Sequence, residues 1–128
     1  MHVEAMKQAA VEALEEIKAR DITVLDVRKL TSLFDYMIIA TAESARQTKA
    51  LAHNVQEKLR GLGARPQGLE GEQSGEWVLV DLGDIVVHVM QPAIRQYYNL
   101  EQLWGSHPPS PHPTTWRNPP AAEPPAAL

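Results

Sequence analysis

The chain has 128 residues, enough for one domain with a hydrophobic core and too few for two. Its formal net charge of −4 argues against nucleic-acid binding as the main role, because phosphate contacts require clustered Lys and Arg side chains. Cysteine is absent, which excludes disulfides, thiolate metal ligands and cysteine nucleophiles. No stretch is long and apolar enough to span a membrane, and the first residues resemble neither a signal peptide nor a transit peptide, so we expect a cytoplasmic protein.

The first part of the chain predicts one helix followed by two strands. Apolar residues at helical spacing predict an amphipathic helix over residues 3–20 that ends near Asp21. Residues 22–27 and 35–41 are expected to be strands, and the second has the nearly continuous apolar run of a buried strand.

A second, longer helix is expected to begin at Ser44. Gln47 stands three residues after Ser44, the spacing of a capping box, and Gly61 and Gly63 are suitable stop signals. Residues 43–65 hold five basic side chains against two acidic ones, so a modest basic patch on this helix is an open possibility.

The clearest local prediction is a β-hairpin formed by residues 77–82 and 85–90. Gly83 and Asp84 join the two strands, and Gly in the first central position fits a type II′ turn. The resulting register pairs Val80 with Val87 and makes one face purely aliphatic, which predicts core. The opposite face is mixed and carries Trp77, Leu79, Asp81, Val86, His88 and Met90.

The mixed hairpin face has two interpretations, which the sequence leaves open. A partner could dock on it, or a helix or loop of the same chain could cover it. Residues 67–91 carry five acidic side chains and no Lys or Arg, which favours a basic protein partner over a small molecule.

The remaining elements complete an order of α-β-β-α-β-β-β-α. Residues 66–70 predict a short edge strand, residues 92–98 a short helix, and residues 100–104 a further turn. We therefore expect a single α/β domain over residues 1–105, with a mixed β-sheet of about five strands and flanking helices. Eight of the ten prolines lie in residues 106–128, which predicts a disordered tail.

The aromatic residues near the end of this domain are expected to pack the terminal helix onto the sheet. Tyr97, Leu100 and Leu103 are the predicted packing residues, while Tyr98 and Trp104 are expected to be partly exposed.

No motif for catalysis or metal binding stands out. A metal-dependent nucleotidyltransferase needs converging carboxylates and a Gly-Ser phosphate loop, but the turn before the second helix places Glu43 where a phosphate would lie. His53 and His88 lack partners at metal-ligand spacing, and His88 is expected to form a hydrogen bond beside Asp81 or Trp77. We predict no enzyme activity, no cofactor and no metal. The carboxylates that the enzyme alternative would use are Asp35, Glu70, Asp81 and Asp84.

Three segments closely resemble the ribosomal silencing factor family, RsfS or Iojap-like. They are residues 35–52 (DYMIIATAESARQTKALA), 68–90 (GLEGEQSGEWVLVDLGDIVVHVM) and 95–104 (RQYYNLEQLW). The likeness covers roughly residues 5–104 and leaves the Pro-rich tail outside.

The resemblance implies a nucleotidyltransferase-like topology without catalytic residues. It implies binding to the large ribosomal subunit through ribosomal protein uL-fourteen, steric blocking of subunit joining, and repression of translation under nutrient limitation. No direct DNA binding and no membrane association are expected, and the free protein could be a homodimer. A divergent nucleotidyltransferase-like enzyme and a dimeric assembly factor with another target are the alternatives.

The family's acidic, aromatic binding surface maps onto the mixed hairpin face and the edge strand beside it. Trp77 is expected to be the buried anchor of the interface, because Trp is enriched at interface hot spots. The predicted partner-binding residues are Glu70, Gly71, Trp77, Leu79, Asp81, His88 and Met90.

Overall fold

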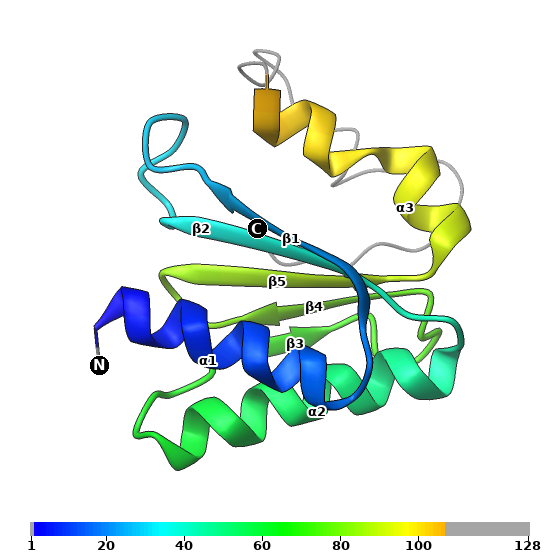
Figure 1. The fold of residues 1–128 in the computed structure, drawn as a ribbon, viewed down its shortest axis with the longest axis horizontal. Helices are drawn as coiled ribbons and strands as arrows, with labels where there is room; N and C mark the ends of the chain where they lie inside the picture. The colour runs from blue at the N-terminus through cyan, green and yellow to red at the C-terminus, as the bar shows by residue number, and fades with distance from the viewer. Residues whose placement is uncertain (1, 107–128) are drawn as a thin grey trace.

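Five strands form one sheet with helices on both of its faces in the computed structural model, which describes residues 2–106 (Figure 1). The elements are α1 (Val3–Glu16), β1 (Arg20–Asp26), β2 (Tyr36–Thr41), α2 (Ala45–Gly61), β3 (Gly68–Glu70), β4 (Trp77–Asp81), β5 (Ile85–Met90), α3 (Pro92–Tyr98) and the π-helical turn η1 (Gln102–Ser106). The predicted single α/β domain is confirmed over this range. The predicted tail lies outside the described residues, apart from Ser106.

The strand order is β1-β2-β5-β4-β3, and the sheet is mixed as expected. β2 runs parallel to β5, and the other three neighbouring pairs are antiparallel. The predicted hairpin register is confirmed, since Val80 pairs with Val87. Of the two turn residues, only Gly83 has a positive φ, 88°, as a type II′ turn requires.

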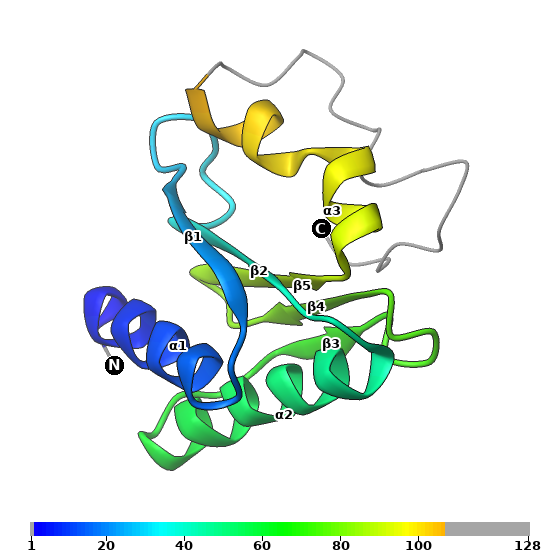
Figure 2. The same cartoon turned by 45° about the vertical axis from the view of Figure 1, so that its right-hand side comes forward.

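Each face of the sheet has its own hydrophobic core. α1 and α2 cover one face, where the aliphatic side of the β4–β5 hairpin packs with Ile38 and Ala40 of β2 (Figure 2). α3 and η1 lie on the other face, over Trp77, Leu79 and Met90. The domain is therefore a three-layer structure in which the short C-terminal helices form the third layer.

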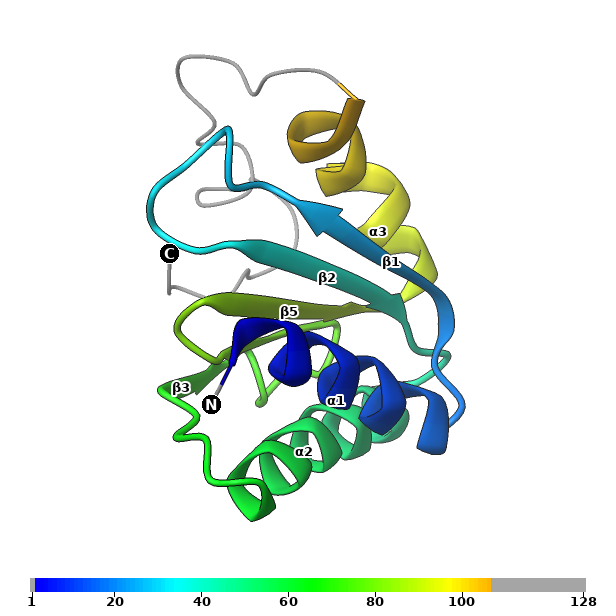
Figure 3. The same ribbon diagram turned by 60° about the vertical axis from the view of Figure 1, so that its left-hand side comes forward.

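α1 ends at Glu16, four residues before the predicted end, in a Schellman turn in which the Ala19 nitrogen donates to the Leu14 carbonyl and the Lys18 nitrogen to the Glu15 carbonyl. The side-chain amide of Gln47 in α2 donates hydrogen bonds to the carbonyl oxygens of the next two residues, Ile17 (3.1 Å) and Lys18 (3.2 Å), and so holds this turn against α2. Lys18 then adopts a positive φ of 66°, and β1 begins at Arg20. Figure 3 shows α1 turning sharply into β1 beside the first turn of α2.

The first turn of α2 follows the predicted capping pattern with one change. The Ser44 hydroxyl accepts a hydrogen bond from the backbone nitrogen of Gln47 (3.1 Å), and Ser44 is the N-cap of α2. The side-chain oxygen of Gln47 accepts a hydrogen bond from the backbone nitrogen of Glu43 (2.7 Å), whereas in a capping box it would accept from that of Ser44. Within residues 2–106, no helix combines the length and apolar character that a membrane span requires.

Candidate binding surface

The chain itself covers the mixed hairpin face, so the second of the two interpretations describes this structure. Trp77 and Met90 are fully buried, and Leu79 and His88 are 1% exposed. The expectation that Trp77 is directly available as an interface anchor is therefore wrong for this conformation. The side chains that alternation placed on one face do share it, but α3 and η1 pack over them.

The aromatic contacts show how α3 covers this face. Trp77 lies 5.0 Å from the Tyr98 ring, centroid to centroid, and Phe34 lies 5.8 Å from Trp104. Tyr98 and Trp104 are thus buried, whereas Tyr97 is 60% exposed. The sequence prediction had the two tyrosines reversed and Trp104 too exposed, but it was right that Leu100 packs on the sheet.

His88 is an interior hydrogen-bond partner of Trp77. The Trp77 indole nitrogen donates to His88 Nδ1 at 2.9 Å, which confirms one of the two expected contacts. Burial lowers the pKa of His88 to about 3, because a charged imidazolium loses its hydration in the core. At neutral pH His88 is uncharged with its proton on Nε2, so it orders the core and carries no charge toward a partner.

Three of the seven predicted partner-binding residues remain accessible. Glu70, Gly71 and Asp81 are partly exposed at the β3 side of the sheet. The register places Glu70 opposite Leu79, and Gly68 opposite Asp81, so both carboxylates point to the face that α3 occupies. Their chain segment contains no cation, and the accessible surface here is acidic.

The loop between β3 and β4 is held tightly against α2. Gly75 lies so close to Ala45 that a Cβ atom added to it would come within 2.7 Å of the Ala45 Cβ, so no larger residue fits without a backbone shift. Glu72 in the same loop is hydrogen-bonded to the His53 ring of α2. These two contacts fix the acidic loop beside the N-terminal half of α2.

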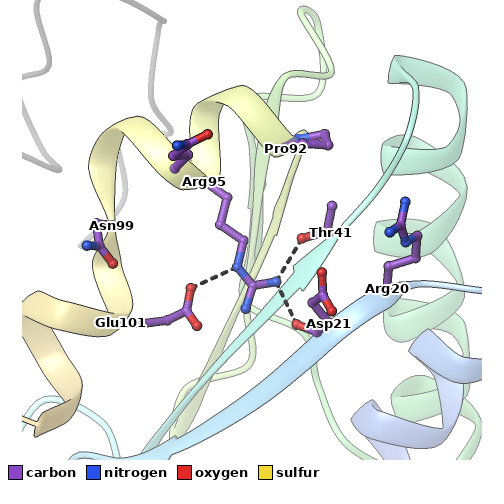
Figure 4. Close-up of a pocket in the computed structure, with 8 residues that line it drawn as sticks. Arg20, Asp21, Thr41, Pro92, Arg95, Asn99 and Glu101 are labelled. Carbon is purple, nitrogen blue, oxygen red and sulfur yellow. Dashed lines mark hydrogen bonds and ion pairs between the residues drawn. The ribbon is translucent and has the colours of Figure 1, made fainter.

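A cavity of about 340 Å³ lies where α3 meets the edge strand β1 and its neighbour β2 (Figure 4). Arg95 of α3 points into it and is 11% exposed. Its guanidinium donates to Glu101 Oε1 (2.8 Å), the Asp21 carbonyl (2.6 Å), Thr41 Oγ1 (2.8 Å) and Thr23 Oγ1 (3.0 Å).

Through these hydrogen bonds Arg95 connects α3, in the third layer, to strands β1 and β2 of the sheet. Its donors already have protein partners, and its proximity holds the pKa of the Glu101 carboxyl below its usual value. The other cation at the rim, Arg20, is paired with Glu43. Three of the four charged side chains that line the cavity, Arg20, Arg95 and Glu101, are thus paired within the domain. The sequence analysis missed this role of Arg95, because its partners on the sheet lie more than fifty residues away along the chain.

The carboxylates of the enzyme alternative do not form a metal centre. Within residues 2–106, no group of three or more His, Asp or Glu side chains is arranged to hold a metal ion. Glu43 stands before α2 as expected, with its charge balanced by Arg20.

Comparison with known proteins gives a consistent result. The family model described as "Ribosomal silencing factor during starvation" (RsfS) matches residues 1–127, further than the expected 5–104 and including most of the Pro-rich segment. A ribosomal silencing factor RsfS from Chromobacterium violaceum is 57% identical over 110 residues, which are 86% of this chain and 90% of that protein. A crystal structure of a C. violaceum protein has a TM-score of 0.81 at 57% identity, covering 86% of this chain and 92% of the other.

A more distant relative comes from the mouse. The "Mitochondrial assembly of ribosomal large subunit protein 1" of Mus musculus is 34% identical over 97 residues, which are 73% of this chain and 42% of that protein.

Proposed function

This chain belongs to the ribosomal silencing factor (RsfS) family, and we propose that it binds the large ribosomal subunit and blocks its joining to the small subunit. The contact on the large subunit is ribosomal protein uL-fourteen, and the result is repression of translation in the cytoplasm when nutrients are limiting. The match of nearly the whole chain to this family is the observation that carries the proposal.

The charge of the accessible surface supports a basic protein partner. Glu70 and Asp81 lie on one side of the sheet within a segment that contains no Lys or Arg, and ribosomal proteins are commonly basic. Complementary charge accelerates the encounter of two proteins and disfavours incorrect partners. The exposed Tyr97 ring on α3 adds an aromatic side chain to the same face of the sheet.

The predicted interface residues then divide into two groups. Glu70, Gly71 and Asp81 are placed to contact the partner, together with Tyr97. Trp77, Leu79, His88 and Met90 act from beneath by holding β4, β5 and α3 in position, because they are buried in this structure.

The proposed mechanism is steric occlusion and requires no bond to be made or broken. A domain of this size occupying the face of the large subunit that meets the small subunit prevents the two from pairing. The names of the bacterial relatives, and the large ribosomal subunit in the name of the mouse relative, support a role on the large subunit.

Subunit association followed by light scattering at low magnesium concentration tests the proposal. A several-fold molar excess of the protein should lower the amplitude of association, and the protein should sediment with free large subunits. Unchanged association at that excess contradicts the proposal.

Two substitutions test the surface itself. The double variant Glu70→Lys, Asp81→Asn reverses the charge at residue 70 and neutralises the charge at residue 81. Asn at residue 81 preserves the oxygen that accepts the 2.8 Å hydrogen bond from the Gly83 nitrogen. We expect about a tenfold slower association with large subunits, because electrostatic steering is lost. Glu15→Lys on α1 is the matched control, an exposed acidic residue on the other side of the sheet.

A further inference from the structure

A row of mostly cationic side chains runs along the solvent-facing side of α2. Its members recur every three or four residues, and the opposite side of the helix packs on the sheet. At 1.5 Å per residue the row is about 21 Å long. It consists of Arg46, Lys49, His53, Glu57 and Arg60.

The first two cations of the row have no counterion within residues 2–106. Arg46 is exposed and Lys49 is partly exposed, and neither forms an ion pair there. Lys18 is a third exposed cation. Its backbone lies beside the first turn of α2, where its carbonyl oxygen accepts a hydrogen bond from the Gln47 side chain. By contrast, Lys58 and Arg60 of the same helix are paired with acidic residues.

Helix stability does not account for this arrangement. Two like charges three residues apart repel each other by a few tenths of a kcal/mol, and cations in the first turns oppose the helix dipole. Arg46 and Lys49 are three residues apart in the first two turns of α2. Their placement is thus mildly unfavourable for the free protein and is best explained by a negatively charged partner.

The row lies in a different layer from the acidic surface. α2 covers one face of the sheet (Figure 2), while the strand register places Glu70 and Asp81 on the other. The hydrogen bond between Glu72 and His53 lies at the boundary between the two charged zones. A single partner of one charge cannot complement both zones, but a ribosomal subunit offers basic protein and RNA phosphate side by side.

We infer that the α2 row, led by Arg46 and Lys49, binds the phosphate backbone of ribosomal RNA beside the protein that meets the acidic surface. This inference rests on the proposed function, which supplies the large subunit as the source of the RNA. Contacts of this kind fix orientation and carry no sequence information, since they touch phosphates rather than base edges.

The salt dependence of binding to isolated large subunits tests the inference. Each phosphate contact contributes about 0.7 to 0.9 to the slope of log affinity against log salt concentration. The double variant Arg46→Gln, Lys49→Gln should therefore have a slope shallower by about 1.4 to 1.8. At 0.1 M salt the double variant should bind roughly 25- to 60-fold more weakly than the wild-type protein. This factor is the difference in slope applied to the tenfold change in salt concentration between 1 M and 0.1 M. Lys29→Gln is the matched control, because Lys29 is an exposed cation in the loop between β1 and β2.

A second measurement identifies the partner in contact with the row. The chain has no cysteine, so Ala50→Cys, within the exposed side of α2, gives a unique site for a photo-crosslinker. Crosslinks to ribosomal RNA support the inference, whereas crosslinks to ribosomal protein alone overturn it. An unchanged salt slope for the double variant also overturns it, and leaves the proposed function intact if the wild-type protein still binds.

The same two variants separate failure of the proposed function from failure of this inference. If the wild-type protein does not bind large subunits, the proposed function fails, and a 20-base-pair RNA duplex at low salt becomes the probe. Weaker duplex binding by the double variant than by Lys29→Gln then supports an RNA-binding row, and equal binding by all three proteins overturns it.

Discussion

Replacing Trp77 by alanine should destabilise the domain severely. Trp77 is fully buried between the sheet and α3, and its ring contacts both Tyr98 and His88. Truncation of a buried Trp to Ala typically costs about 3 to 5 kcal/mol of unfolding free energy, and the His88 nitrogen that accepts the indole proton also loses this partner. Because a domain of this size has a total stability of about 5 to 15 kcal/mol, the loss is a large fraction of the whole.

Thermal unfolding followed by circular dichroism measures this cost. A loss of about 3 kcal/mol or more should lower the Tm by at least about 12 °C in a domain of roughly 100 residues. The control is Trp77→Phe, which keeps an aromatic ring in the site but removes the hydrogen bond and part of the indole volume, so it should cost about 1 to 3 kcal/mol.

Binding to large subunits distinguishes a structural role for Trp77 from an interface role. At a temperature where Trp77→Phe is folded, its affinity should match that of the wild-type protein, because residue 77 is covered by α3. A Trp77→Ala protein that melts within a few degrees of wild type, yet no longer binds large subunits, would refute this reasoning. It would mean that α3 moves away and that Trp77 meets the partner directly.

Three further outcomes are expected from buried groups and from the end of the chain. The unfolding free energy, measured by urea unfolding, should fall by up to about 1.4 kcal/mol per pH unit as the pH drops from 6.5 toward 4.5. The reason is that His88 takes up a proton near pH 6.5 in the unfolded chain but only near pH 3 in the folded protein. The His88→Gln variant should lack this contribution to the dependence of unfolding free energy on pH. Arg95→Met should cost about 1 to 3 kcal/mol in the same assay, since it removes hydrogen bonds to four acceptors while the partly exposed Glu101 is still solvated, and Arg95→Lys should not restore stability because one ammonium group cannot reach all four acceptors. Removal of residues 107–128 should change the unfolding free energy by no more than about 0.5 kcal/mol and leave subunit binding intact; a large loss of binding would show that the part of the family match beyond Ser106 is functional.

Local patterns in the sequence were sufficient to predict most of the sheet. The Gly83-Asp84 turn determined the hairpin register, and the apolar run over residues 35–41 identified a buried strand. These features depend on neighbours within a few residues, so their physics is contained in a short stretch of chain.

The errors arose where a distant segment decides the structure. α1 ends early in a turn at Lys18, and Gln47, thirty residues away, holds this turn by binding the carbonyl groups of Ile17 and Lys18 just after the helix. Alternation correctly grouped Trp77 with Met90 on one face, but it contains no information about what covers that face. In α3, which has only seven residues, a one-position change in helical phase exchanges a buried Tyr98 for an exposed Tyr97.

The strand order has a consequence for how the chain folds during synthesis. β5 occupies the centre of the sheet, yet it is the last strand to be made, and its parallel partner β2 is about fifty residues earlier. Long-range parallel pairing is slow, because the loop must close before the contacts form. The β4–β5 hairpin is local and can form as soon as both strands have left the ribosome.

The N-terminal half, α1 through α2, therefore cannot complete a core until residue 90 has been synthesised. Its apolar strand β2 remains without its central neighbour while residues 42–90 are synthesised, and exposed strand edges are prone to aggregate in this interval. The third layer arrives last of all, so the surface proposed to recognise the large subunit is assembled only when the described domain is almost entirely synthesised.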